Sequence, residues 1–129
     1  MGSEDRLRMN APTTPWPTEL RVDAARAALS ITFDDGEHFA LPAEYLRVES
    51  PSAEVQGHSA AQKQTVAGKR HVKIVSVEPV GNYAARIIFN DGHDTGLYSW
   101  DYLHELGRGQ NTKWSTYLSA LRKTGGKRE

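Results

Sequence analysis

The sequence predicts an α+β fold: two strand–Asp-Gly hairpin–short helix units that form small antiparallel sheets, plus a C-terminal helix. Apolar and polar residues alternate before both Asp-Gly pairs, at positions 35–36 and 91–92, which is the period of half-buried strands. Asp-Gly between alternating segments is a strong hairpin signal, because both residues tolerate the positive φ of a tight turn. After Trp114, apolar residues recur at helical spacing and predict a helix with one apolar face.

In the first unit, residues 20–22 and 29–33 predict two strands, and residues 38–41 return from the hairpin. A short helix is expected over 43–48, because proline at position 42 suits the first turn, where its missing N–H has no intrahelical partner. The long segment 52–70 has weak periodicity, and we expect it to be partly ordered over 52–55 and mobile over 57–69.

In the second unit, residues 71–80 carry apolar side chains on both faces, which predicts a strand more central than the first pair. The next strand is expected to turn one face inward, made of Tyr83, Ala85, Ile87 and Phe89. A short strand to Leu97 follows the second hairpin, and the next helical turn carries Trp100, Leu103 and Leu106. Gly107 and Gly109 are expected to stop that helix, as glycine does at helix ends. The last helix is expected to begin after Asn111 or Thr112 as N-cap and to bury Trp114, Tyr117, Leu118 and Leu121.

The two units resemble each other in sequence. Residues 31–36 precede residues 87–92 at the same spacing that separates Leu41 from Leu97, and Tyr45-Leu46 matches Tyr102-Leu103 after a one-residue slip. Such units can bury their apolar faces against each other. An internal repeat is the favoured interpretation, and coincidence between two ordinary hairpins is the alternative, since Asp-Gly hairpins are common.

The chain length of 129 residues suits one domain. Residues 1–17 are polar and rich in proline and predict a disordered arm, residues 18–123 form the domain, and residues 124–129 are expected to be a disordered tail. No apolar run is long enough to cross a bilayer, and the first residues lack the apolar core of a signal peptide, so the cytoplasm is the expected location.

Charge and cysteine content exclude several classes of function. Lys plus Arg equal Asp plus Glu at 16 each, so net charge favours no class of partner. Bases without acids over 58–73 and 108–128 predict either an ordinary solvated surface or a patch for an acidic partner. The absence of cysteine excludes disulfides, thiolate nucleophiles and cysteine-ligated zinc or iron–sulfur centres.

Six residues are candidates for binding: His93, Asp91, Ser50, Ser52, His58 and Trp100. His93 and Asp91 flank a glycine in the second turn, so chain geometry brings imidazole and carboxylate together, for metal or acid–base chemistry or simply for turn hydrogen bonds. The serines lack the Gly-x-Ser-x-Gly elbow of hydrolases, and no phosphate-binding glycine loop is present. Trp100, with Tyr102, Trp114 and Tyr117, forms either core or a stacking surface for nucleic acid.

Four segments resemble a known family: Leu41–Arg47, Ser50–Glu54, Glu78–Tyr83 and Phe89–Gly96. Together they are similar to the gamma-butyrobetaine hydroxylase-like N-terminal domain, which occurs alone in bacteria, ahead of an oxygenase domain, or attached to iron–sulfur scaffold proteins. The resemblance implies an α+β domain that, in the hydroxylases, holds zinc through three cysteines and one histidine.

By this resemblance, the zinc-binding cysteines correspond to Ser50, Ser52 and Val55, and the histidine to His93. Two serines and a valine cannot replace three thiolates, so we expect no zinc and no other cofactor. The oxygenase half is absent, so hydroxylase activity is not carried over.

We therefore expect a non-enzymatic accessory or protein-interaction domain, linked to iron–sulfur or metal-dependent assemblies by family association alone. Its partner is expected to be another protein, bound at a contiguous apolar patch beside segment 52–70, and no membrane is expected. One alternative is a metal-binding protein that uses His93 with nearby oxygen ligands. Another, less favoured, is a nucleic-acid binder that uses Lys69, Arg70, Lys73 and the basic C-terminal helix.

Overall fold

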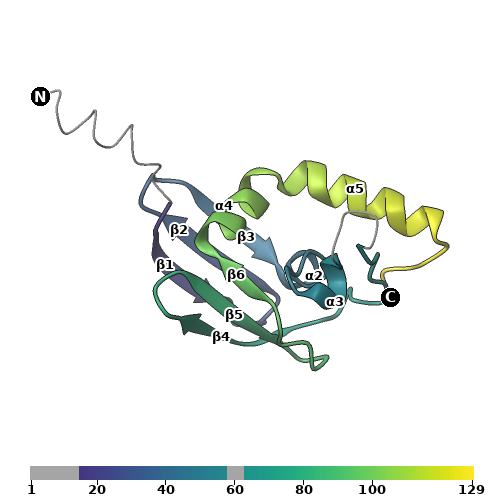
Figure 1. Ribbon diagram of the computed structural model, residues 1–129, viewed down its shortest axis with the longest axis horizontal. Coiled ribbons are helices and arrows are strands. Elements are labelled where there is room, and N and C mark those ends of the chain that lie inside the picture. Colours follow the sequence, from purple (N-terminus) through teal and green to yellow (C-terminus); the bar gives the residue numbers. More distant parts are fainter. Residues whose placement is uncertain (1–14, 58–62) are drawn as a thin grey trace, which may run out of the picture.

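The computed structural model describes residues 15–57 and 63–129. Its strands lie at one end of the molecule, and the long helix α5 extends toward the other (Figure 1). The element order is β1 (Pro17–Val22), β2 (Ala28–Phe33), β3 (His38–Pro42), α2 (Ala43–Val48), α3 (Ala53–Gln56), β4 (Ile74–Val80), β5 (Ala84–Phe89), β6 (Leu97–Ser99), α4 (Trp100–Arg108) and α5 (Gln110–Lys123). Within the described ranges, no helix is long and apolar enough to cross a bilayer.

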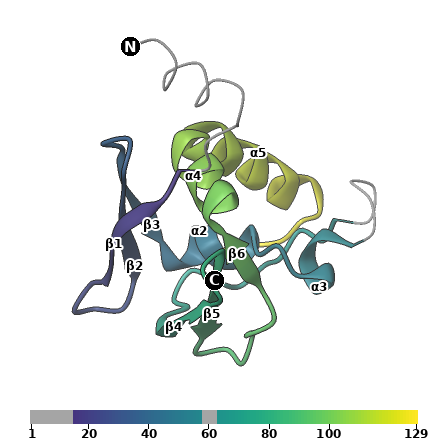
Figure 2. The ribbon, with the colours of Figure 1, turned by 60° about the vertical axis from the view of Figure 1, so that its left-hand side comes forward.

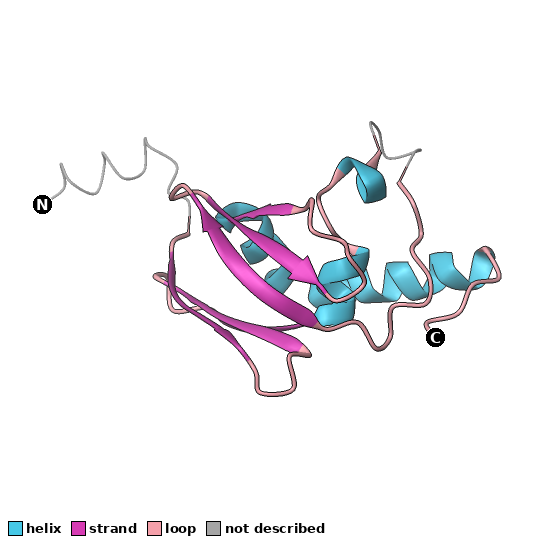
Figure 3. Cartoon of the chain, turned by 90° about the horizontal axis from the view of Figure 1, so that it is seen from below, coloured by secondary structure: helices cyan, strands magenta, loops and turns pink. Residues whose placement is uncertain are grey.

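The strands form two antiparallel three-stranded sheets, in the orders β1-β2-β3 and β4-β5-β6. Figure 2 shows them as separate layers, and in Figure 3, seen from below, the strands splay apart at their outer edges. Each sheet leads directly into a helix, α2 after β3 and α4 after β6. The α+β class with two small sheets and a C-terminal helix is thus confirmed.

The main core lies where the inner faces of the two sheets meet α2 and α4. The first sheet contributes alternate residues of β2, and the second contributes alternate residues of β5, as the period of two requires. The largest completely buried side chains are Tyr45, Tyr98, Phe33, Phe89, Leu29, Ile31, Leu41, Leu46, Ile74, Ile87, Leu103 and Leu106.

The two Asp-Gly turns make the same hydrogen bonds. Asp35 Oδ1 accepts from the backbone N–H two residues later, at 2.9 Å, and Asp91 Oδ1 does the same at 3.1 Å. Gly36 and Gly92 have φ values of 88° and 91°, and each donates its N–H to the phenylalanine carbonyl that ends the preceding strand. The units are therefore alike in structure at their turns, while their origin by duplication stays a prediction.

Each turn is tied to the helix of the other unit. Asp35 Oδ2 lies 2.8 Å from His104 Nε2 on α4, and Asp91 Oδ2 accepts from Arg47 Nε on α2 at 2.8 Å. After the one-residue slip of the repeat, His104 and Arg47 occupy matching positions, each directly after a Tyr-Leu pair. These two side-chain contacts join the two units across their interface.

Replacing Gly92 with valine is expected to destabilise the protein by about 1–3 kcal/mol, because a β-branched residue is strained at positive φ. The cost comes from the backbone alone, since nothing lies within 4 Å of a Cβ built at Gly92. Thermal unfolding measures it, with Gly92→Asn as the control, because asparagine tolerates this conformation. Equal melting temperatures for the two variants would contradict the assignment of the strain to φ.

The structure corrects the prediction for the second sheet. β4 begins at Ile74 and not at residue 71, and it is an edge strand, while the central position belongs to β5. The apolar residues on its second face do not require a central position, because one of them, Val75, is half exposed beside the unpaired edge of the sheet. Tyr83 was expected to face inward with β5, but it lies in the turn before that strand and is exposed.

Gly107 does not stop a helix. It lies inside α4, which continues to Arg108, and α5 begins at Gln110, before the expected N-cap residues. A Cβ at Gly107 would lie 2.3 Å from Phe39 Cγ, so a residue without a side chain is needed where α4 packs against Phe39 of β3. Gly109 is the actual junction between α4 and α5.

Two segments expected to lack order have defined contacts in the described part of the chain. Over 63–69, Gln64 N–H donates to Val55 O and Tyr117 Oη donates to Val66 O. Over 124–129, Lys127 O accepts from the backbone N–H of Gly68, so the two segments lie side by side. Each segment supplies backbone hydrogen-bond partners for the other, and the domain bounds expected from the sequence stay a prediction.

Candidate functional site

The structure brings together three of the predicted site residues. Ser50 follows α2, Ser52 precedes α3, and His93 follows the second Asp-Gly turn. His93 Nε2 lies 2.9 Å from Ser50 Oγ and 3.4 Å from Ser52 Oγ, and the two hydroxyl oxygens are 3.3 Å apart. All three residues are buried, so this cluster joins the end of the first unit to the turn of the second.

Gly96 makes room for this cluster. A Cβ at Gly96 would lie 2.5 Å from Ser50 Oγ and 3.1 Å from the Tyr98 ring. The glycine follows Thr95 in the irregular segment between the turn and β6, so the backbone itself packs against Ser50. The close approach explains why a residue without a side chain stands there.

The second nitrogen of the His93 ring faces a carboxylate. Nδ1 lies 3.3 Å from Glu54 Oε1, and the same oxygen accepts from Thr95 Oγ1 at 2.6 Å. Burial lowers the pKa of His93, and the nearby charge of Arg47 lowers it further, against the opposing effect of Glu54 and the neighbouring aspartates. The imidazole is therefore neutral at neutral pH, one nitrogen donating and the other accepting.

Asp91 is the centre of a second set of contacts beside His93. Its Oδ2 accepts from Arg47 Nε at 2.8 Å and from Lys69 Nζ at 2.6 Å. Burial alone raises the pKa of Asp91, but hydrogen bonds from Lys69, the His93 backbone and Arg47 lower it to about 2. Arg47 keeps one buried nitrogen, Nη1, without a hydrogen-bond partner in the described part of the protein.

Acid is expected to destabilise the protein through Asp91. Its folded-state pKa is lower than the unfolded value, so its contribution is fully present above about pH 4 and is lost as the pH falls toward 2. A shift of this size corresponds to roughly 2 kcal/mol. Urea unfolding at pH 7 and at pH 3 measures the loss, which should be smaller in Asp91→Asn. The same pH dependence in both proteins would contradict this role.

The donor set does not fit the zinc site that the resemblance implies. Ser50 and Ser52 supply neutral hydroxyls where zinc prefers thiolates, and Val55 supplies no donor atom. Across residues 15–57 and 63–129, no group of three or more His, Cys, Asp or Glu side chains is placed to hold a metal. The hydroxyls instead satisfy the buried histidine by hydrogen bonds.

The order Ser50–His93–Glu54 has the form of a nucleophile, a base and an orienting acid. A serine nucleophile must reach a substrate, but Ser50 is 0% exposed. A hollow of about 350 Å³ beside the cluster is lined by His93, Glu54, Asp91 and Arg47 and not by Ser50. In this arrangement Ser50 acts as a structural hydrogen-bonding group.

The remaining candidates lie elsewhere. Trp100 is buried at the start of α4, where its indole N–H donates to Asn82 O and its ring packs against Trp16. His58 lies outside the described residues. The sequence did not single out Arg47 or Glu54; the match of Arg47 to His104 in the repeat was the one available signal.

Comparisons with known proteins identify the family and similar solved structures. The family model for "Gamma-butyrobetaine hydroxylase-like, N-terminal" matches residues 20–104. Two solution NMR structures share 41% and 45% sequence identity with the chain, both with a TM-score of 0.79; they cover 91% and 92% of this chain and 92% and 89% of their own.

A crystal structure from Acidithiobacillus ferrooxidans ATCC 23270, of a protein of unknown function in the DUF971 family, shares 40% identity with a TM-score of 0.59. The match covers 70% of this chain and 91% of that one. None of the curated proteins matches the chain. With the family model covering most of the chain, the protein belongs to the gamma-butyrobetaine hydroxylase-like N-terminal domain family.

Proposed function

We propose that this protein is an accessory domain that binds an extended segment of another protein in a groove between β1 and β4. The observation that carries the proposal is an apolar groove of about 380 Å³ at the open side of the two sheets. We call it the edge groove, and define it by Leu29 and Ala85 at its floor and Leu20, Val22, Val75 and Val77 at its walls.

The edge groove is a place where the core reaches the surface. Leu29 and Ala85 are completely buried, whereas Leu20 and Val75, on the two edge strands, are among the most exposed large apolar residues described. β1 and β4 end their sheets, so in the described chain their outer backbone groups pair with no further strand. An added strand is a common way to complete such an edge. The groove, and not the surface beside segment 52–70, is the apolar patch that supports an interaction role.

The charges at the groove favour an acidic, apolar segment. Arg21 and Arg26 line it, and no acidic residue does. Arg26 Nη1 donates to Val75 O at 2.8 Å and so links its side chain to strand β4. The Arg21 guanidinium is exposed and contacts Glu19. A bound strand with alternating apolar residues would cover the walls, and its carboxylates would lie near these guanidinium groups.

Selection of random twelve-residue peptides displayed on phage tests the proposal. We expect the selected peptides to alternate apolar with Asp or Glu residues, and Leu20→Asp or Val75→Asp to weaken their binding at least tenfold. Leu97→Asp is the matched control, because Leu97 is 43% exposed against 49% for Val75 but lies outside the groove.

Two kinds of result, from the peptide selection and from sedimentation, would overturn this proposal. One is selection of peptides without acidic residues, or of peptides whose binding survives both groove substitutions. The other is a wild-type dimer in sedimentation experiments that dissociates in Leu20→Asp, because a second copy of the chain would then fill the groove. Arg21→Glu adds a charge test: it should weaken the acidic peptides and leave the melting temperature unchanged.

A further inference from the structure

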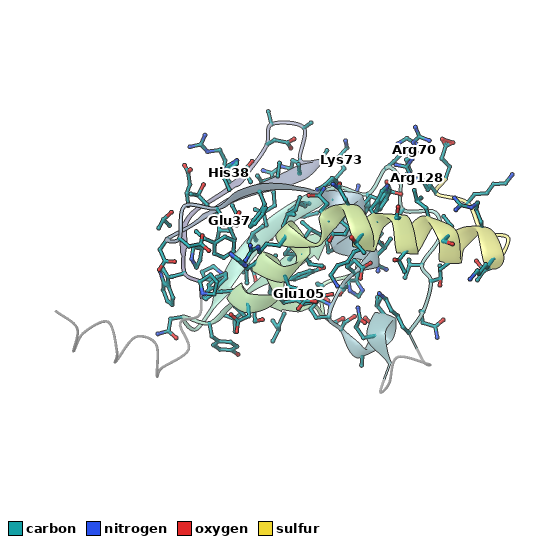
Figure 4. The ribbon with its side chains drawn as sticks, turned by 90° about the horizontal axis from the view of Figure 1, so that it is seen from above. Glu37, His38, Arg70, Lys73, Glu105 and Arg128 are labelled. Carbon is teal, nitrogen blue, oxygen red and sulfur yellow. The ribbon has the colours of Figure 1, made fainter. Side chains whose placement is uncertain are left out.

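A second site lies far from the edge groove, where segment 124–129 turns back along α5. Gly125, with φ of 75°, follows the helix, and Gly126 N–H donates to Leu121 O, which reverses the chain. The backbone carbonyls of Lys127 and Arg128 then accept from the N–H groups of residues 68 and 70. Arg70 and Arg128 accordingly lie close together beside α5 (Figure 4).

The Arg128 side chain fills a pocket made by other parts of the chain. Its guanidinium donates from Nε to Glu44 Oε2 at 2.9 Å and from Nη2 to Glu44 Oε1 at 2.7 Å. The guanidinium carbon also lies 5.4 Å from the centre of the Trp114 ring, and Tyr45 packs edge-on against that ring. A paired carboxylate and an aromatic face are the two features that select a planar guanidinium over other cations.

We propose that Glu44, Trp114 and Tyr45 form an arginine-recognition pocket, held closed by Arg128, that accepts an arginine side chain of a partner protein when segment 124–129 is displaced. With Arg128 in place, a cavity of about 220 Å³ remains beside its side chain, lined by Arg128 itself, by these three residues and by Pro42 and Gln110. It shares no lining residue with the edge groove, so the two proposals stand independently.

Segment 124–129 is held in a way that permits exchange. It contains no large apolar side chain, and each of its residues is exposed or half-buried. Its attachments are backbone hydrogen bonds, the Arg128–Glu44 pair and the contact of Arg128 with Trp114, for which the backbone and an arginine of a partner's peptide can substitute. The bridge from Arg70 to Glu129, at 3.6 Å, is exposed on both sides and adds little.

Glu44 does not belong to this segment: it lies in the first turn of helix α2 and stays with the domain when the segment leaves. It is 7% exposed, and Arg128 is the one cation that bonds to it in the described chain. Without Arg128, the Glu44 carboxylate loses both hydrogen bonds from its guanidinium, so the open pocket offers them to another guanidinium. Arg128 competes from within the same chain at an effective concentration on the order of millimolar. The wild-type pocket therefore admits only a partner that binds well enough to displace it.

Titration of the Arg128→Ala protein with N-acetyl-arginine amide tests the proposal, with the assigned indole N–H signal of Trp114 as the reporter. We expect a saturable shift in Arg128→Ala and at least tenfold weaker binding in the wild type. The neutral isostere N-acetyl-citrulline amide should give no shift, and Glu44→Gln combined with Arg128→Ala should abolish binding. Lys127→Ala is the matched control: it removes a neighbouring cation, leaves Arg128 in place, and should behave as wild type.

The proposal is overturned if folded Arg128→Ala shows no saturable shift of Trp114, or if citrulline amide shifts the signal equally. Arg128→Gln provides a second route in case alanine prevents folding. N-acetyl-arginine amide should then raise the melting temperature of Arg128→Gln and have no effect in the Glu44→Gln, Arg128→Gln double variant. Equal effects of the amide on both variants would show a general salt effect and would also overturn the proposal.

Discussion

Replacing Gly107 with alanine is expected to lower the melting temperature by roughly 10–20 °C, which corresponds to about 3 kcal/mol for a domain of this size. The added methyl group would lie 2.3 Å from Cγ of Phe39 and less than 3 Å from two further ring atoms. Non-bonded carbon atoms do not approach so closely, so helix α4 and strand β3 would have to separate.

Phe39 cannot easily yield to this methyl group. Its ring packs edge-on against Phe33, with centroids 6.0 Å apart, and against His104, with centroids 5.6 Å apart. His104 in turn bonds to Asp35 in the first turn. Movement of Phe39 would therefore disturb both the core and one of the side-chain contacts that join the two units.

A double-mutant cycle separates this steric cause from a general effect on the helix. Gly107→Ala should cost much less in a Phe39→Ala background, because the ring that meets the methyl group is then absent. Gly109→Ala is the matched control at the helix junction, where the nearest atom to a new Cβ is 3.3 Å away. The same cost of Gly107→Ala in both backgrounds would contradict the steric explanation.

The role of Gly107 could not be predicted from the local sequence. Gly36 and Gly92 were correctly assigned to tight turns because the signal is local: an aspartate precedes each glycine, and alternating residues flank it. Gly107 was read as a helix stop by the same kind of rule. The structural reason for a glycine at position 107 is its contact with the Phe39 ring, 68 positions earlier in the chain, and no local sequence pattern reveals such a contact.

The residues of the candidate site also fall into two groups, those that local sequence predicts and those that it does not. His93 and Asp91 were found because two residues that flank a turn glycine must lie close together. Arg47 and Glu54 reach them only because the first unit packs against the second. The edge position of β4 was also missed, since apolar residues on both faces suit a central strand as well as a strand beside an open groove. Local turn chemistry was predictable from the residues, and contacts between the units were not.

Introducing cysteine at positions 50, 52 and 55 together is expected to create a zinc site with His93. In a tetrahedral site, sulfur and nitrogen ligands lie about 3.5 Å apart and two sulfurs about 3.8 Å apart. The corresponding distances are now 2.9 and 3.4 Å from His93 Nε2 to the two serine oxygens and 3.3 Å between those oxygens. The geometry thus needs to expand by only a few tenths of an ångström, which the longer carbon–sulfur bond favours.

The expected result is a melting temperature that depends on zinc in the Ser50→Cys, Ser52→Cys, Val55→Cys protein and not in the wild type. At a free zinc concentration 1,000 times the Kd, the added stability would be about 4 kcal/mol. Thiolate ligation gives cobalt(II) a strong absorption band, which provides a readout independent of stability. Adding His93→Gln should remove one ligand and weaken both effects. A folded triple variant that shows neither effect would mean that positions 50, 52, 55 and 93 are not arranged to hold a metal in this chain.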